Sequence, residues 1–292
     1  MTQIVVLSGK GGTGKTSLVA SFAAIANDTV VVDCDVDAPD LHLLLRPSVL
    51  KVKDFYGEDL AFIDKEKCIK CGLCIQNCRF NAINSDFEID NLSCEGCGVC
   101  SIVCPTQAVT TVKQKAGEVY ISKTAYGLMV HALLFLGQEN SGKLVTMTRL
   151  IAAAVASEQR KSLILIDGSP GIGCPVIASV TNVDYAMIVT EPTESGIHDL
   201  KRLLELLKIF SIKPFVCINK FDINEENTKR IQEFCELEKI PIGGKIPFDP
   251  VFVDAMVNGK TVIEYARDSA VAKELTNIWS KVNAIINNKK EE

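Results

Sequence analysis

Two cysteine runs restrict the folding of this chain more than any other feature of its sequence. The spacing C-x-x-C-x-x-C-x-x-x-C occurs twice, and the second run repeats the first 26 residues later. The eight cysteines are Cys68, Cys71, Cys74, Cys78, Cys94, Cys97, Cys100 and Cys104. Three thiolates on a tight loop and a fourth on the next turn can converge on one small volume, as a [4Fe–4S] cluster requires. Zinc is the alternative, because C-x-x-C pairs also form tetrahedral zinc sites.

The segment around these runs consists of two similar halves. Asp64 and Ala82 of the first half recur 26 residues later as Asp90 and Ala108. Neither half is large enough to bury a core of its own, so bound metal must supply the cohesion. We therefore expect removal of iron to unfold this segment.

The runs resemble those of two-cluster bacterial ferredoxins, in which the fourth cysteine of each run ligates the other cluster. The resemblance implies two ligand sets, which are Cys68, Cys71, Cys74 and Cys104 for one cluster and Cys94, Cys97, Cys100 and Cys78 for the other. Pro105 follows Cys104 as in ferredoxins, whereas Arg79 stands where a second proline would be expected. Four thiolates per cluster leave no open iron for substrate, so we expect these clusters to carry electrons.

The composition is typical of a globular protein and disfavours several partner classes. The chain has 292 residues, of which 47% are hydrophobic and 23% charged, and its formal net charge is −5. This charge gives no bulk attraction for nucleic acid or anionic lipid, so neither nucleic acid nor a membrane is an expected partner. No apolar run approaches the roughly 18 residues that span a bilayer, and an apolar strand stands where a charged leader would be. We expect a cytoplasmic protein whose 12 cysteines stay reduced.

A glycine-rich loop lies near the start of the chain. The stretch Lys10-Gly11-Gly12-Thr13-Gly14-Lys15-Thr16 connects a predicted strand, Ile4–Leu7, to a predicted helix from about Thr16 to Asn27. Such glycines let backbone N–H groups turn towards phosphate oxygens, and the helix adds its positive end. We expect Lys15 to bind the β- and γ-phosphates and Thr16 to bind Mg²⁺. The expected nucleotide-binding residues of the loop are Gly11, Gly12, Thr13, Gly14, Lys15, Thr16 and Ser17.

Apolar strands alternate with helices along most of the chain. Further predicted strands are Thr29–Val32, Leu163–Asp167, Tyr185–Thr190, Phe215–Asn219 and one near Lys245. Continuous apolar strands are buried on both faces, which predicts an α/β fold with a doubly wound, mostly parallel sheet of the P-loop NTPase type. The pattern breaks after Leu45, where the chain turns at Arg46-Pro47 and loses its helical periodicity. The predicted domains are a discontinuous ATPase domain, 1–55 and 117–292, and a small inserted α+β ferredoxin-like domain, 56–116.

A second lysine in the glycine-rich loop connects the chain with a known superfamily. Lys10 precedes the glycines, where the ordinary G-x-x-x-x-G-K-[ST] loop has no lysine. Further motifs are Asp33-Cys34-Asp35, Asp167-Gly168-Ser169-Pro170-Gly171, Glu191-Pro192-Thr193 and Ile246-Pro247-Phe248-Asp249-Pro250. With these motifs the chain resembles the MinD, ParA, Mrp and nitrogenase iron-protein superfamily of P-loop ATPases, and its insert makes it similar to the members that contain a ferredoxin domain.

This resemblance implies a role for each matching residue. Lys10 would reach across a homodimer, formed on ATP binding, to the partner's nucleotide. Asp33 would hold Mg²⁺ through water, and Asp35 would orient the attacking water. Asp167 would be the Walker-B-like carboxylate, and Gly171 would be a hinge of the switch loop. Carboxylates at the carboxyl ends of parallel strands face the phosphate crevice, which agrees with these roles.

Asn219 and Pro247 complete the predicted nucleotide site. Asn219 opens the stretch Asn219-Lys220-Phe221-Asp222 directly after a predicted strand, and in the resembled superfamily this Asn contacts adenine. The same N-K-x-D pattern reads guanine in small GTPases, so GTP is the alternative to ATP. Cys174 follows Asp167 at the spacing of a cluster-ligating cysteine of the nitrogenase iron protein, and a structural role and a dimer-bridging role both stay open.

Three functions follow from these features. The first is an Mg²⁺-dependent ATPase that dimerises on ATP and couples its nucleotide state to electron transfer through two [4Fe–4S] clusters. The second is an assembly or maturation ATPase that loads iron–sulfur or other metal cofactors onto client proteins. The third is a positioning switch of the MinD and ParA kind with redox-sensing clusters. The sequence does not identify the redox or client partner.

Overall fold

The computed structural model describes residues 1–26, 29–136 and 141–287. The chain divides into two compact units. The larger unit comprises Met1–Val52, Val119–Leu133 and Ser141–Glu292. The smaller unit, called the cysteine unit below, comprises Lys53–Glu118 and Leu134–Asn140. None of the described helices is long and apolar enough to cross a membrane.

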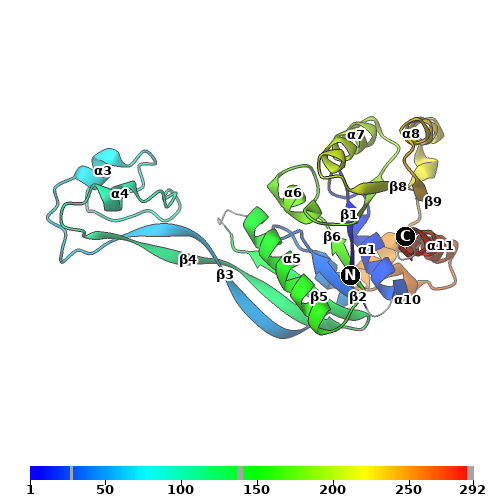
Figure 1. Cartoon of the computed structure of the whole chain (residues 1–292), viewed down its shortest axis with the longest axis horizontal. Coiled ribbons are helices and arrows are strands. Elements are labelled where there is room, and N and C mark those ends of the chain that lie inside the picture. Colours follow the sequence, from blue (N-terminus) through cyan, green and yellow to red (C-terminus); the bar gives the residue numbers. More distant parts are fainter. Residues whose placement is uncertain (27–28, 137–140, 288–292) are drawn as a thin grey trace. The chain divides into compact units, whose positions relative to one another are not determined.

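A nine-stranded sheet organises the described part of the chain, in the order β3-β4-β5-β2-β6-β1-β7-β8-β9 (Figure 1). Its strands are β1 Thr2–Leu7, β2 Thr29–Asp33, β3 Ser48–Ile63, β4 Val109–Thr124, β5 Gly127–Leu134, β6 Leu163–Asp167, β7 Tyr185–Thr190, β8 Lys213–Asn219 and β9 Ile242–Ile246. Pairing is parallel from β5 through β2, β6, β1, β7 and β8 to β9. The central strands are short apolar runs whose residues are almost all buried, as expected of a parallel sheet covered on both faces.

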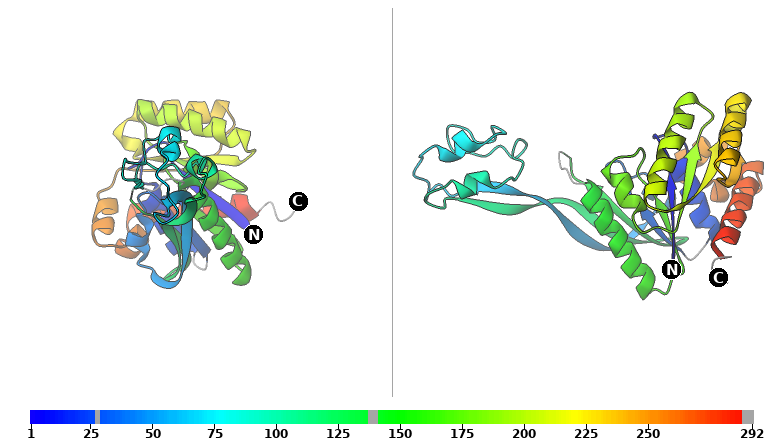
Figure 2. Two further views of the ribbon diagram at one scale, coloured as in Figure 1. Left: turned by 90° about the vertical axis from the view of Figure 1, so that its left-hand side faces the viewer. Right: turned by 45° about the horizontal axis from the view of Figure 1, so that its top comes forward.

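Helices cover this sheet (Figure 2). Those of the larger unit are α1 Lys15–Ala26, α2 Leu41–Leu45, α5 Ser141–Glu158, α6 Cys174–Val180, α7 Glu194–Ile209, the 3-10 turn Phe221–Ile223, α8 Glu225–Leu237, α9 Val251–Val257, α10 Val262–Tyr265 and α11 Ala270–Asn287. On one face α1 and α11 bury the ring of Phe22 against Trp279, with 5.2 Å between the ring centroids. Ile4 and Val6 of β1 belong to this core, and strand alternation turns Val5 towards the other face. Helix α5 contacts β2 and β6, α6 contacts β1, and α7 contacts β7 and β8.

Hydrogen-bonding side chains begin several of these helices. The Thr193 side chain accepts from the Gly196 N–H at the start of α7, and Asn224 accepts from Asn227 at the start of α8. Both residues are favoured N-caps because their oxygens satisfy an otherwise unpaired N–H group. The predicted helix after the glycine-rich loop is confirmed as α1, and its predicted end at Asn27 lies outside the described residues.

The chain loses its helical periodicity after Leu45 as expected, but the long strand that begins there was not predicted. β3 starts at Ser48 and continues for 16 residues, and β4 has the same length. Val49, Leu50 and Val52 of β3 are 53%, 61% and 46% exposed, so this strand lacks the alternation that reveals a half-buried strand. Helices α6 and α10 were also missed, because each has fewer than eight residues and offers little periodicity.

The hairpin between β4 and β5 requires a glycine at its second strand. Gly127 has a φ of +134° and pairs with Thr29 of β2. A Cβ at this position would lie 2.4 Å from the Thr29 carbonyl oxygen. Only glycine permits this approach, which joins the β4–β5 hairpin to the parallel sheet.

The cysteine unit repeats its backbone contacts as it repeats its sequence. The Asp64 N–H donates to the Ala108 carbonyl and the Asp90 N–H donates to the Ala82 carbonyl, each at 2.8 Å. Two short helices, α3 Leu73–Asn77 and α4 Val99–Ile102, begin after glycines in the left-handed region. The two halves therefore exchange hydrogen bonds across a pseudo-twofold arrangement.

The core of the cysteine unit is small. Its buried members are Ala61, Ile63, Cys74, Ile83 and Val109. Cysteine side chains form much of the shell around this core, including Cys68, Cys78, Cys94, Cys100 and Cys104. A core in which thiols replace apolar side chains gains its cohesion when those thiols bind metal.

Candidate functional site

The glycine-rich loop adopts the conformation that phosphate binding requires. Gly12 and Gly14 have φ values of +79° and +87°, in the region that favours glycine. A Cβ on Gly14 would lie 2.5 Å from the amide nitrogen of Asn219, so the loop closes tightly at its helical end. Gly11 and Gly12 are exposed at the other end. The loop is thus anchored where it joins α1 and open where a ligand would enter.

Lys15 and Asp167 form a buried ion pair beneath this loop. The Lys15 ammonium contacts Asp167 Oδ1, and both side chains are almost fully buried. Burial opposes the charge on Lys15, but Asp167, with smaller contributions from Asp33 and Asp35, outweighs it and raises the pKa of the lysine. Asp167 Oδ2 is buried without a hydrogen-bond partner among the described residues. An orphaned carboxylate oxygen of this kind fits a site that binds a cation.

Two further carboxylates belong to the same site. Asp33 ends β2 and pairs in register with Asp167, which ends β6. The Asp33 oxygens accept from the N–H groups of Asp35 at 3.0 Å and Leu41 at 3.2 Å. Burial, and then the negative charge of Asp167, raise the pKa of Asp33 well above its usual range, and burial also raises the pKa of Asp35. Three acids share one lysine, so Mg²⁺ would supply the missing positive charge.

Hydroxyl groups lie around these acids. The Thr16 hydroxyl is 3.4 Å from the Lys15 ammonium, and the Thr13 hydroxyl is buried without a partner among the described residues. The Ser169 hydroxyl donates to the Cys34 carbonyl at 2.5 Å and links the loops that follow β6 and β2. Ser17 lies on the first turn of α1, where its carbonyl accepts from the Ser21 hydroxyl.

Gly171 connects the loop after β6 to the glycine-rich loop. Its φ is +90°, and its N–H donates to the Ser8 carbonyl at 3.0 Å. Ser8 in turn donates from its hydroxyl to the Lys10 carbonyl at 2.9 Å. A movement at Gly171 would therefore reach the start of the phosphate loop.

Asn219 lies directly behind the loop and is 3% exposed. Its amide N–H donates to the Thr13 carbonyl at 2.8 Å, and its oxygen accepts from the Lys220 N–H at 3.0 Å. Pro247 directly precedes Phe248, whose N–H donates to the Asp222 carboxylate at 2.7 Å. Hydrogen bonds thus bring the loops after β8 and β9 together, and the Asp222 carboxylate is engaged by the backbone.

Glu191 was not predicted as a site residue, although it contacts two lysines of the site. Its carboxylate lies 2.5 Å from Lys220 and 3.7 Å from Lys10. The Lys10 ammonium also donates to the Ser195 hydroxyl at 3.1 Å. Two sequence signals pointed to Glu191, which are its place in the Glu191-Pro192-Thr193 motif and its position directly after β7, at the same edge as Asp33 and Asp167.

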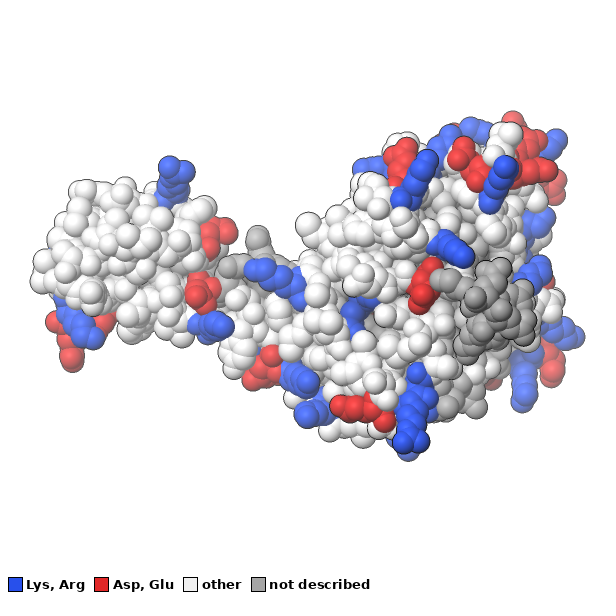
Figure 3. Space-filling view, in the orientation of Figure 1, with Lys and Arg blue, Asp and Glu red and all other residues white. Residues whose placement is uncertain are grey.

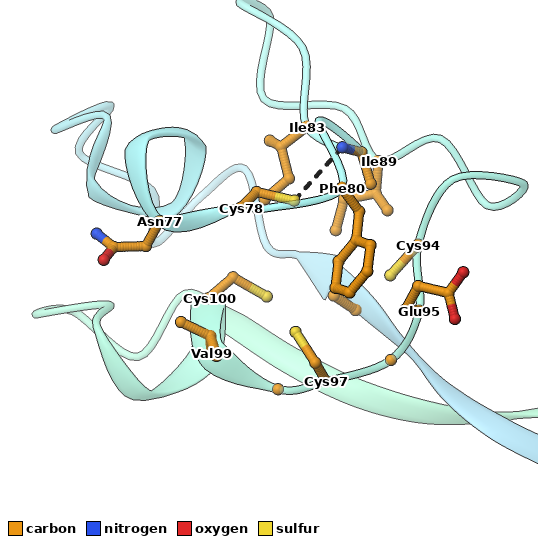
Figure 4. A pocket seen from close by; sticks show the side chains of 14 residues that line it. Asn77, Cys78, Phe80, Ile83, Ile89, Cys94, Glu95, Cys97, Val99 and Cys100 are labelled. Atoms are coloured by element: carbon orange, nitrogen blue, oxygen red, sulfur yellow. Dashed lines mark hydrogen bonds between the residues drawn. The ribbon is translucent and has the colours of Figure 1, made fainter.

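Four thiols from both cysteine runs line one pocket (Figure 4). The pocket contains about 370 Å³ of space between atoms, part of it open to solvent, and its thiols are Cys78, Cys94, Cys97 and Cys100. The remaining wall is mostly apolar, with contributions from Ala61, Ile83 and Phe80. These four cysteines are the set that crossed ligation assigns to one cluster. Within the described residues no three potential ligands converge closely enough for a single metal ion.

Three of the remaining thiols, Cys68, Cys71 and Cys74, lie close enough to influence one another electrostatically. Burial raises the pKa of Cys74, and the neighbouring Cys68 and Cys71 add to the rise. The Cys104 sulfur accepts from the Ala108 N–H at 3.2 Å, and the Cys78 sulfur accepts from the Ala82 N–H at 3.4 Å. Hydrogen bonds of this kind to the ligand sulfurs tune iron–sulfur clusters.

Four cysteines lie outside the runs. Burial raises the pKa of Cys34 and Cys217 to about 12 and that of Cys235 to about 11, which keeps these thiols protonated and inert. Cys174 is exposed at the start of α6, and a Cβ on Gly142 would lie 3.3 Å from its Cβ.

Comparison with known proteins places the fold. Residues 4–262 match the family model described as the CobQ/CobB/MinD/ParA nucleotide binding domain. An uncharacterised protein of Methanocaldococcus jannaschii is 36% identical over 228 residues, which cover 77% of this chain and 80% of the relative. The MinD structure from Pyrococcus horikoshii, complexed with Mg-ADP, has a TM-score of 0.61 at 17% identity and covers 99% of this chain and 98% of its own.

A shorter match concerns a different class of protein. The pyruvate synthase subunit PorD of Methanothermobacter marburgensis is 43% identical over 54 residues, which cover 18% of this chain and 67% of that subunit. With the two cysteine runs, this partial match agrees with an inserted ferredoxin-like region. The family match over most of its length shows that the chain belongs to the CobQ/CobB/MinD/ParA nucleotide-binding family.

Proposed function

We propose that this protein is a cytoplasmic, Mg²⁺-dependent ATPase that dimerises on ATP and couples its nucleotide state to electron transfer through two [4Fe–4S] clusters. The observation that carries the proposal is the pocket in which Cys78 of the first run lies with Cys94, Cys97 and Cys100 of the second. A nucleotide-binding fold that also gathers four thiols in an apolar pocket has the parts for both tasks. The predicted division into an ATPase domain and an inserted ferredoxin-like domain is part of the proposal.

The nucleotide site supports hydrolysis that depends on a divalent cation. In the proposal, backbone N–H groups of the loop and Lys15 bind the phosphates, while Thr16 and Asp33 hold Mg²⁺, which neutralises developing phosphate charge. Asp35, at the mouth of the site, orients the attacking water. The Asp167 oxygen that has no partner among the described residues would accept from water bound to the cation. Lys10 acts on the nucleotide of the partner subunit.

ATP is the expected nucleotide. Reading guanine through N-K-x-D requires an acid that accepts from the base, and in this chain one oxygen of Asp222, Oδ1, already accepts from the Phe248 N–H. The visible face of the larger unit carries lysines, arginines and acids interspersed (Figure 3), unlike the uniformly basic face that is typical of nucleic-acid binding.

The coupling follows from chain continuity. The loop after Asp33 leads through α2 directly into β3, which continues into the cysteine unit. Within this loop the Leu41 N–H at the start of α2 donates to Asp33, so a change at the Mg²⁺ ligand acts on α2. β4 returns from the cysteine unit to the same sheet. Nucleotide binding and cluster chemistry are therefore separated by one short helix and one strand.

Anaerobic reconstitution tests the proposal. The loaded protein should contain about eight non-haem irons per monomer, as two [4Fe–4S] clusters require, and should bind MgATP in preference to MgGTP. Its ATPase rate should differ between dithionite-reduced and oxidised clusters. Tetrahedral zinc in place of iron, or a rate that ignores the cluster redox state, would refute the proposal. Retention of all iron after incubation with an apo-ferredoxin would separate it from a cluster-delivery function.

A further inference from the structure

We propose that the surface around the first cysteine loop, residues 65–73, is the docking site for an acidic electron-transfer protein. The inference rests on the proposed function, and it names the cluster loop and the partner chemistry that this function leaves open. Three differences between the two cysteine loops carry it: their backbone environment, their apolar exposure and their charge.

The two loops have the same backbone but different surroundings. Lys70 and Gly96 occupy equivalent positions, 26 residues apart, with φ values of +57° and +59°. A Cβ on Gly96 would lie 2.0 Å from the Asp59 carbonyl oxygen of β3, so the second loop packs directly on this strand. The first loop instead has an exposed lysine, although a residue with a Cβ is strained at this φ by roughly 1 kcal/mol. Lys70 of the first loop is therefore exposed to solvent, whereas the equivalent Gly96 is packed on β3.

Apolar side chains surround the exposed cysteine of the first loop. Ile69 and Leu73 are 63% and 38% exposed, and Cys71 between them is exposed as well. In the second loop the equivalent Val99 is likewise 38% exposed and Cys97 is exposed, so the apolar difference lies at Ile69, whose place is taken by Glu95. A transient interface needs an apolar centre with a polar rim, and electron transfer needs that centre close to the cluster. Ile69 and Leu73 provide such a centre next to a cluster ligand.

Charge distinguishes the loops further. Between Asp64 and Cys74 the first run has three lysines and two acids, whereas between Asp90 and Cys100 the second run has two acids and no cation. The side chains of Lys65 and Lys67 are 67% and 65% exposed, and their ion pairs with Glu88 and Asp64 are exposed too. Exposed pairs contribute little, so carboxylates of a partner can compete for these lysines.

Lys70 has no acid within ion-pair distance among the residues that the structure describes. Its ammonium group can therefore pair with a carboxylate of a partner protein without first breaking an ion pair. The cationic rim of the first loop fits a partner with carboxylates around its own redox centre, because complementary charge steers encounter. The second loop, packed on β3 and acidic, would repel the same partner.

The test uses the full chain, loaded with iron anaerobically and reduced with dithionite. Stopped-flow measurement follows cluster oxidation by tris(oxalato)cobaltate(III), an anion, and by hexaamminecobalt(III), a cation. Each transfer moves one electron from a reduced cluster to Co(III), which becomes Co(II). Lys70→Glu should slow the anionic oxidant by roughly threefold to tenfold at low salt and accelerate the cationic one, and about 0.5 M salt should remove both effects. Lys70→Gly, which keeps the backbone of Gly96, should give intermediate rates.

Lys113→Glu provides the matched control, since Lys113 is an exposed lysine of the same unit on β4. Equal rates for Lys70→Glu and Lys113→Glu in fully iron-loaded protein would overturn the inference and leave the proposed function intact. Failure of the unaltered protein to load iron would instead refute the proposed function. A faster reaction of Lys70→Glu with the anion would also overturn the inference.

Discussion

At the scale of single residues, Glu191 holds Lys10 within its own chain. The carboxylate bridges Lys10 and Lys220, and Ser195 accepts a further hydrogen bond from Lys10. In the proposed dimer, Lys10 has to leave these contacts before it can reach the partner subunit's nucleotide. We therefore infer that Glu191 opposes dimerisation until ATP is bound.

Glu191→Gln should strengthen the ATP-dependent dimer. The substitution removes the charge that retains Lys10, and the loss of a partly exposed ion pair corresponds to roughly threefold in the dimer dissociation constant. Analytical ultracentrifugation with a non-hydrolysable ATP analogue measures this constant. Glu194→Gln is the control, because Glu194 is 72% exposed and pairs with Arg230 instead. A weaker dimer for Glu191→Gln would show that this residue acts in the dimer and not against it.

The lowered pKa of His131 makes the stability of the larger unit depend on pH. Burial, and then the nearby His42, lower the pKa of His131 from its usual value near 6.5 to about 4. Above pH 6.5 neither the folded nor the unfolded chain protonates this histidine, and its contribution to stability is complete. Between pH 6.5 and 4 only the unfolded chain takes up the proton, so stability falls by up to about 3 kcal/mol.

His131→Gln should remove most of this loss while keeping an acceptor for the Ser122 hydroxyl, which lies 3.1 Å from the ring. Urea denaturation of both proteins at pH 7.5 and 4.5 measures the difference. The raised pKa of Asp33 gives a slope of opposite sign in both proteins and cancels in the comparison. Parallel loss of stability in both proteins would contradict the prediction.

At the scale of elements, the sequence predicted the parts of the fold that follow a simple pattern. β1, the glycine-rich loop and α1 were recognisable because a continuous apolar strand, three glycines and an apolar helix follow one another. β3 was not recognisable from the sequence, because its first valines and leucine are all exposed and no buried residue alternates with them before Phe55. β3 is a strand because it pairs with β4, which starts 46 residues after β3 ends.

The candidate site divides in the same way. Asp33 and Asp167 could be placed together from sequence because each ends an apolar strand, and parallel strands end at one edge of the sheet. The Lys10, Glu191 and Lys220 contacts could not be placed, since they join side chains from three distant segments whose rotamers depend on the finished fold. The cysteine pocket was predictable through the ferredoxin resemblance and not from spacing alone.

Gly96 and Gly72 offer a matched pair at this scale. Both have positive φ, so alanine strains each backbone by a similar amount, roughly 1–2 kcal/mol. A Cβ on Gly96 would meet the Asp59 carbonyl at 2.0 Å, whereas a Cβ on Gly72 meets no atom within 4 Å among the described residues. Gly96→Ala should therefore reduce iron content towards one cluster per monomer, and Gly72→Ala should keep two. Iron analysis with EPR spectroscopy of the reduced proteins checks this, and equal loss in both would contradict it.

At the scale of the whole molecule, the two units differ in what holds them together. The larger unit has an extensive apolar core on one face of its sheet, which includes Phe22, Phe215 and Trp279. Among the described residues of the cysteine unit, the buried apolar cluster has five members and a shell of thiols around it. We therefore expect the larger unit to fold without metal and the cysteine unit to depend on it.

Chelation of iron should therefore unfold the cysteine unit alone. Removal of the clusters leaves eight thiols unbridged around a core too small to offset the entropy of ordering the segment, so Lys53–Glu118 should become sensitive to protease. MgATP affinity should change by less than about threefold, because Lys15, Asp33 and Asp167 lie in a core that contains no metal ligand from the runs. Limited proteolysis and nucleotide titration, before and after anaerobic chelation, measure the two effects. If iron loss abolished ATP binding as well, the units would fold as one, and the nucleotide site would depend on the clusters for its structure rather than only for its electrons.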